Sequence, residues 1–173
     1  MSRITIDDVT EAIRKVRSMS LREKEALAEE IHLCQPHMLA SCLVQSKLGV
    51  NPAAVEFLLN ILLVCYQSMK ESGLQWSVIT EDEQERQMQR WIGAAHFSEH
   101  AVGAAGADNA REQYASQHPE QPLLAFVLSE TNQWLREISQ RNGEAESDKF
   151  VMMASLNLVN CIAGAPVLSA AHG

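Results

Sequence analysis

The sequence predicts an all-α protein, a bundle of about six to eight helices in one domain that spans residues 1–173. Three observations support this fold class. Apolar residues recur at three- and four-residue spacing along most of the chain. Helix-start signals and helix-ending glycines separate these stretches. No segment shows sustained strand-like alternation, and only the short run Gln75–Ile79 resembles a strand.

The first two helices are marked by their start signals. From Thr5 to about Arg17, apolar residues follow helical spacing, and two aspartates lie in the first turn. Ser20 and Glu23 form a capping box, which predicts the start of a second helix. The buried face of this second helix is expected to carry Leu27, Ile31 and Cys34.

The third and fourth helices start at prolines. Pro36 can occupy the first position of a third helix, which runs to Lys47. Asn51 and Pro52 start a fourth helix that ends at Gly73 and is apolar nearly all round. Such a helix belongs in the middle of a bundle because no side of it can face water.

The fifth helix begins at a second capping box, residues 80–83, and carries an apolar stripe over 88–102. Small residues at 103–107 predict a loop, and a short polar helix is expected near 108–116. Pro119 and Pro122 then lead into a helix that glycine ends at position 143. A polar loop at 142–147 precedes the last helix, which is expected to begin near Asp148.

Composition and charge narrow the function classes. The net charge of -8 argues against nucleic acid or an anionic membrane as the main partner. The N-terminus is charged from the start and lacks the apolar segment of a secretory signal. Residues 150–173 carry no Asp, Glu, Lys or Arg, but interspersed Ser, Asn, Gly and Pro favour a buried helix over a membrane span. We therefore expect a soluble, cytoplasmic protein with four reduced, buried cysteines.

Two segments of the chain have similar sequences, which suggests an internal duplication of residues 32–72 and 118–164. Both fit the pattern H-x-x-Q-P before a helix rich in aliphatic residues. The motif residues are His32, Gln35 and Pro36 in the first place and His118, Gln121 and Pro122 in the second. A duplication would place the apolar helices 52–72 and 148–170 side by side at the centre. Chance similarity in a helical sequence of low diversity is the alternative.

The run His96-Phe97-Ser98-Glu99-His100 fits the H-x-x-E-H pattern of a class of zinc peptidases. Histidines at i and i+4 project from one face of a helix, so both can reach one metal ion, with Glu99 beside them. A third protein ligand would be needed, and no downstream residue matches a known pattern. The preferred interpretation is structural. The alternative is a site for a divalent metal such as zinc at His96, Glu99 and His100.

Polar residues in the two most apolar helices form a second candidate site. Buried amides must find hydrogen-bond partners. These residues either fix the pairing of the central helices or line a polar pocket between them. The residues concerned are Glu56, Asn60, Gln67, Asn157 and Asn160.

The function predicted first is an interaction or adaptor protein, whose partner is another protein or a second copy of itself. Exposed Met and Trp side chains are one way to form such a groove, with Met19, Met69 and Met88 as candidates, and the alternative for each methionine is core packing. The alternative is a helical bundle that binds a metal or small ligand, including an enzyme, centred on His96, Glu99 and His100. No nucleotide-binding, hydrolase or di-iron signature is present, so neither a cofactor nor catalytic residues are predicted.

Overall fold

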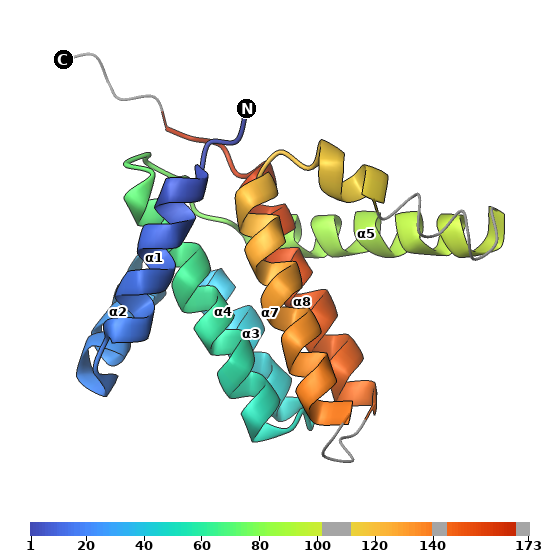
Figure 1. Cartoon of the computed structure of the whole chain (residues 1–173), viewed down its shortest axis with the longest axis horizontal. Helices are drawn as coiled ribbons and strands as arrows, with labels where there is room; N and C mark the ends of the chain where they lie inside the picture. The colour runs from blue at the N-terminus through green and yellow to red at the C-terminus, as the bar shows by residue number, and fades with distance from the viewer. Residues whose placement is uncertain (102–111, 140–144, 169–173) are drawn as a thin grey trace.

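The computed structural model describes the backbone of residues 1–101, 112–139 and 145–168, and the side chains of 1–93, 112–137 and 149–168. Within these residues the chain forms seven long helices and a short helix at 112–117, with no strand (Figure 1). The all-α helical bundle predicted from the sequence is therefore confirmed. The predicted loop at 103–107 lies outside the described residues.

The helix boundaries follow the predicted start signals closely. Within the described residues, α8 begins at Ala145, before the predicted position near Asp148. The long helices are α1 (Ile6–Ser18), α2 (Leu21–Cys34), α3 (Pro36–Lys47), α4 (Pro52–Glu71), α5 (Glu81–Ala101), α7 (Gln121–Ser139) and α8 (Ala145–Gly164).

Local hydrogen bonds explain where these helices start and end. The Ser20 hydroxyl accepts a hydrogen bond from the Glu23 N–H, and the Glu23 carboxylate accepts one from the Ser20 N–H. Both hydrogen bonds of the predicted capping box are therefore present at the start of α2. The Asn51 side chain caps α4. Gly49 after α3 and Gly73 after α4 have φ angles of 82° and 66°, a left-handed conformation that favours glycine at a helix end.

The apolar helices α4 and α8 lie together at the centre. α4 packs against α1, α3 and α8, whereas α8 also packs against α5 and α7. Leu58 and Leu62 of α4 and Val159 and Ile162 of α8 are almost fully buried in one core. Among the described helices, α4 is long and apolar enough to cross a membrane, but 67% of its most apolar stretch is buried, as in the core helix of a bundle.

The 75–79 segment, whose sequence resembles a strand, is an extended connection between α4 and α5. It forms one isolated bridge, between Trp76 and Val167, and no sheet. The side chain of Gln35, which is buried, donates a hydrogen bond to the Ser77 carbonyl at 2.9 Å and accepts one from the Ile79 N–H at 2.9 Å. Gln35 thereby satisfies two backbone groups that a neighbouring strand would otherwise satisfy.

A buried ion pair joins the N-terminal segment to the start of α7. The Glu120 carboxylate, which has no exposed surface, accepts hydrogen bonds from Arg3 Nε at 2.8 Å and from the Ile4 N–H at 3.0 Å. Glu120 directly precedes α7, where a negative charge is favoured by the helix dipole. The pair therefore connects segments that are 117 residues apart in the sequence.

The same arginine caps the far end of α8. Its guanidinium donates hydrogen bonds to the carbonyls of Ile162, Ala163 and Ala165 at 2.6 to 2.9 Å. The Ile162 and Ala163 carbonyls belong to the last turn of α8, and the Ala165 carbonyl follows the helix. The Ile162 carbonyl also accepts a hydrogen bond from the Ala165 N–H at 3.1 Å. A cation at this end of α8 suits the helix dipole. Arg3 lies 4.6 Å from the ring centre of Trp76, so it also holds the 75–79 segment in place. Figure 1 shows the N-terminal segment beside the end of α8.

We expect Glu120→Gln to lower the free energy of unfolding by about 2–4 kcal/mol, because it leaves the Arg3 charge without its counter-charge. Chemical denaturation measures this change. Glu11→Gln is the matched control, since Glu11 pairs with Arg14 on the exposed face of α1, and the free energy should stay nearly unchanged. Equal effects of the two substitutions would contradict the importance of the buried pair.

Candidate functional site

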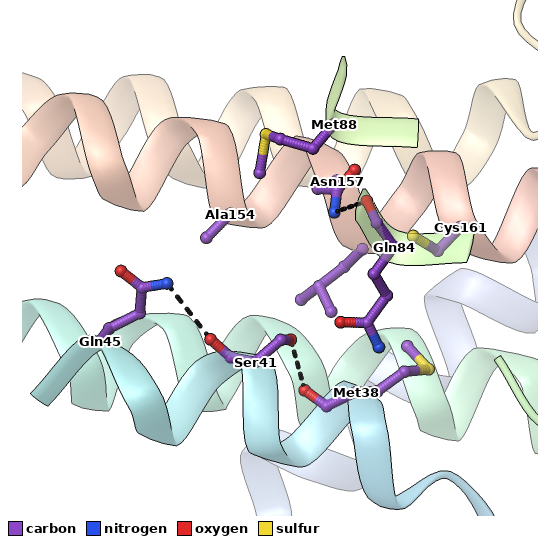
Figure 2. Close-up of a pocket in the computed structure, with 9 residues that line it drawn as sticks. Met38, Ser41, Gln45, Gln84, Met88, Ala154, Asn157 and Cys161 are labelled. Carbon is purple, nitrogen blue, oxygen red and sulfur yellow. Dashed lines mark hydrogen bonds between the residues drawn. The ribbon is translucent and has the colours of Figure 1, made fainter. Parts of the chain in front are cut away.

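A small cavity of about 50 Å³ lies between α3, α5 and α8. Ser41 and Gln45 from α3, Gln84 from α5 and Asn157 from α8 supply its polar groups. Figure 2 shows the Gln84 side chain reaching from α5 toward α3, and Gln45 reaching from α3 toward α8. Three helices that are distant in sequence thus bring three amide side chains to one place.

Each of these amides has one buried atom without a hydrogen-bond partner among the described residues: Gln45 Oε1, Gln84 Nε2 and Asn157 Oδ1. The other ends of two amides are already engaged. Gln45 Nε2 donates to the Ser41 carbonyl at 3.3 Å, and Asn157 Nδ2 donates to the Gln84 carbonyl at 3.0 Å (Figure 2). The amide nitrogens of Gln45 and Asn157 are thus paired, whereas their oxygens have no partner in the described part of the chain. Leaving a buried polar atom unpaired costs about 1–3 kcal/mol, so such a cluster needs an explanation.

The rest of the cavity wall is apolar and uncharged. It is formed by Met38, Met88, Ala154 and Leu158, together with the thiol of Cys161. Burial, and to a smaller extent the negative charge of Glu83, raises the pKa of Cys161 to about 12, so this group is a neutral thiol at physiological pH. The cavity therefore presents hydrogen-bonding groups but no charge of its own.

A second candidate site is a surface groove between α2 and α3. Its apolar part is formed by Leu33 and Leu39, and its acidic part by Glu25 and Glu29, with His32 beside them. Leu33 is 81% exposed. Leucines line this groove, and none of Met19, Met69 and Met88 does.

The polar residues predicted on the central helices are distributed over several places. Only Asn157 lines the cavity. Glu56 is exposed. Asn60 is half-buried, accepts a hydrogen bond from Lys24 of α2 at 3.3 Å and donates one to the Glu56 carbonyl. Gln67 is buried and donates to Glu71 at 2.5 Å.

The remaining residue of this set, Asn160, belongs to a buried network at the start of α7. Its Oδ1 accepts hydrogen bonds from the Tyr114 hydroxyl and from His118 Nε2, the latter at 3.1 Å. His118 Nδ1 accepts from the Glu120 N–H at 3.1 Å. The ring is therefore in the neutral tautomer with its proton on Nε2, since Nδ1 must be unprotonated to accept. Desolvation lowers the pKa of His118, although the contacts with Asn160 and Glu120 act in the opposite direction.

The two H-x-x-Q-P motifs have different surroundings. His32 is exposed, whereas His118 is buried. Gln35 is buried and holds the 75–79 segment, whereas Gln121 is exposed and donates to the Ser116 carbonyl. Both Pro36 and Pro122 lie in the first turn of a helix. The shared pattern thus reflects a helix start in both places, and a duplication is not shown.

The predicted metal ligands His96, Glu99 and His100 lie on α5, but their side chains lie outside the described residues. The zinc site therefore stays a prediction. Among the described residues, no group of three or more His, Cys, Asp or Glu side chains could hold a metal ion.

Of the residues that line the two sites, the sequence analysis singled out Asn157 and His32 and missed most of the others. Gln45, Gln84, Glu25 and Glu29 have the appearance of ordinary surface residues on polar helix faces. A sequence signal exists only for the acidic pair, since residues four apart lie on one face of a helix. Nothing local marks Gln45 or Gln84, because the cavity arises where three helices meet.

The prediction that all four cysteines are buried is wrong for Cys34. Cys42, Cys65 and Cys161 are buried, but Cys34 is exposed. The helical spacing placed Cys34 on the buried face with Leu27 and Ile31, yet α2 ends at Cys34, and the chain turns into α3 there. The core contact continues with Gln35 and Met38 instead.

We expect the free energy of unfolding to fall as the pH decreases from about 7 toward 5, in part through His118. The pKa of His118 in the folded protein lies below its ordinary value of 6.5, so its contribution is complete above pH 6.5 and is lost as the pH falls through the folded-state pKa. Denaturation at a series of pH values measures the slope. His118→Gln should flatten the slope in this range, and His32→Gln, at an exposed histidine, should not. If His118→Gln leaves the slope unaltered, His118 does not contribute to the pH dependence of the unfolding free energy.

A thiol reagent such as a maleimide should modify Cys34 rapidly in the native protein. The other three cysteines should react only after unfolding, since burial excludes the reagent and raises the pKa of Cys42 and Cys161 to about 12. Mass spectrometry of the intact chain counts the modified thiols. Cys34→Ser should remove the rapid reaction. Rapid modification of that variant would contradict the burial of the other three cysteines.

No protein-family model matches this chain, and neither does any curated protein or solved structure.

Proposed function

We propose that this chain is a protein-binding module that holds a basic amphipathic helix of a partner protein in the groove between α2 and α3. The observation that carries this proposal is the combination of exposed leucines and paired glutamates along one groove. Soluble proteins rarely expose apolar side chains in a contiguous group unless a partner covers them.

The apolar part of the groove has the spacing that a helix requires. Leu33 lies at the end of α2 and Leu39 in the following helix, and both line the groove. Leu43, 47% exposed, lies one helical turn beyond Leu39 on the same side of α3. A partner helix with apolar residues at i, i+3 or i+4 and i+7 could bury these leucines along one face.

The acidic part of the groove selects the charge of the occupant. Glu25 and Glu29 are one turn apart on α2, and Leu33 follows one turn later on the same face. Lysine or arginine side chains flanking the apolar stripe of a partner would meet these carboxylates. The net charge of -8 adds a longer-range attraction for a basic partner.

A helix suits this groove better than an extended peptide. An extended peptide gains most of its affinity by pairing with the edge of a sheet, and the described part of the chain contains no sheet. The walls of the groove are two helices, whose side chains can interlock with those of a third.

A synthetic amphipathic peptide with leucines on one face and lysines on its flanks should bind with a dissociation constant of roughly 1–100 µM. Fluorescence anisotropy of the labelled peptide measures binding. Leu33→Ser and Glu29→Lys should each weaken binding at least about tenfold. Added salt should weaken it as well, because the carboxylates are exposed and screened.

Leu21→Ser is the matched control, since Leu21 is also an exposed leucine of α2, at 74%, but does not line the groove. A peptide with glutamates in place of the lysines should bind at least about tenfold more weakly. Equal binding of both peptides, or equal effects of Leu21→Ser and Leu33→Ser, would contradict the proposal. A dimer of this chain that dissociates on Leu33→Ser would instead assign the groove to a second copy.

A further inference from the structure

We propose that the first part of α5, residues 81–93, is a lid that detaches from α3 and α8 as a unit while the other helices stay folded. The inference is independent of the groove between α2 and α3 and of the partner proposed for it. It rests on the shallow burial of the lid, on its polar contacts with α8, and on the incomplete packing beneath it.

The lid is less deeply buried than the central helices. None of the side chains described in α5, those of residues 81–93, is fully buried, and its inner residues, such as Met88 and Trp91, are only partly buried. More than half of the residues of α4, by contrast, are buried. Among the described helices, α5 packs mainly against α8, and Figure 1 shows α5 lying across the other long helices and extending away from them. Because buried apolar surface supplies most of the free energy that holds a helix in place, α5 opens more readily than α4.

Polar groups make much of the contact between the lid and α8. The Gln84 carbonyl accepts a hydrogen bond from Asn157 Nδ2 at 3.0 Å. Glu83 and Gln87 lie over Gly164, where an added Cβ atom would come within 3.1 Å of Glu83 Oε1 and 2.8 Å of Gln87 Nε2. Water can form hydrogen bonds with these polar groups once the lid detaches, so the loss of the contacts is largely offset.

The closed lid is also packed incompletely. Gln84 Nε2 of the lid and Asn157 Oδ1 of α8 are buried without a hydrogen-bond partner among the described residues. Figure 2 shows that the Gln84 side chain extends toward α3, away from the Asn157 oxygen, so the two atoms do not satisfy one another. The cavity of about 50 Å³ between the lid, α3 and α8 removes further contacts. Opening exposes both polar atoms to water, which favours detachment.

The chain is anchored directly before the lid. Ile79 is 2% exposed, and its N–H donates a hydrogen bond to Gln35 Oε1 at 2.9 Å. Thr80 follows and is exposed, so the lid can turn at this residue while the 75–79 segment stays in place. The surface of α3 and α8 that opening uncovers is mainly apolar and includes Met38, Ala154 and Leu158.

Hydrogen exchange of the native protein, followed for single amides by NMR, tests the proposal. The amides of residues 85–93 should share one protection factor, at least about tenfold lower than that of the α4 amides, because they open together. Protection that changes steadily from one end of the segment to the other indicates fraying and would overturn the proposal. Protection equal to that of α4 would overturn it as well.

Val127→Ala separates opening of the lid from unfolding of the whole chain. Val127 has no exposed surface and belongs to α7, which stays folded when the lid opens. Loss of its methyl groups should speed the exchange of the α4 amides at least about fivefold. The amides of residues 85–93 should exchange at an unchanged rate, and equal acceleration of both sets would show that the lid opens only through global unfolding.

Gln84→Met replaces the unpaired amide by an apolar side chain of similar length that can pack against Met38 and Leu158. Exchange at residues 85–93 should slow at least about fivefold. Gln89→Met is the matched control, because Gln89 is exposed on α5 and does not line the cavity, and its exchange should match that of the unmodified chain. Equal exchange rates in the two variants would contradict the proposed weakness of the closed lid.

Discussion

The buried contact between Arg3 and Glu120 is the constraint on which the arrangement of the helices depends. One guanidinium neutralises a carboxylate that has no access to solvent, satisfies three carbonyls at the end of α8, and lies over the ring of Trp76. Both helix ends involved have a dipole of the right sign for the charge they meet. The N-terminal segment, the end of α8, the start of α7 and the 75–79 segment are thus held by a single side chain.

The same contact is made at the end of α8, a central helix that packs against several others. With its end capped by Arg3, α8 packs along α4, and its polar residues face two different neighbours. Near the start of α7, Asn160 accepts hydrogen bonds from Tyr114 and His118, which fix the packing of these side chains. Asn157 lies one turn earlier, meets α5 through the Gln84 carbonyl, and contributes to the cavity. A central helix therefore serves both packing and a candidate ligand site.

The helix α3 connects the two candidate sites. Met38 and Cys42 bury one side of it in the core, and Gln45 extends this side to the cavity. Leu39 lies on the flank that borders α2 and the groove. A partner seated in the groove would thus contact the same short helix that supplies an acceptor to the cavity. This geometry follows from the 3.6-residue period, which separates neighbouring side chains onto different faces.

The sequence by itself determined the helices and their ends, because those depend on contacts within a few residues. The Ser20 capping box and the apolar faces of α4 and α8 are of this kind, and they sufficed to predict an all-α bundle with two central helices. Only the tertiary structure decided that Cys34 faces solvent, that Gln35 and Gln121 differ in role, and that Arg3 meets Glu120. These outcomes depend on how helices pack over long sequence distances. Many arrangements of these helices are compatible with the same local sequence preferences, and the packing of side chains between helices selects one of them.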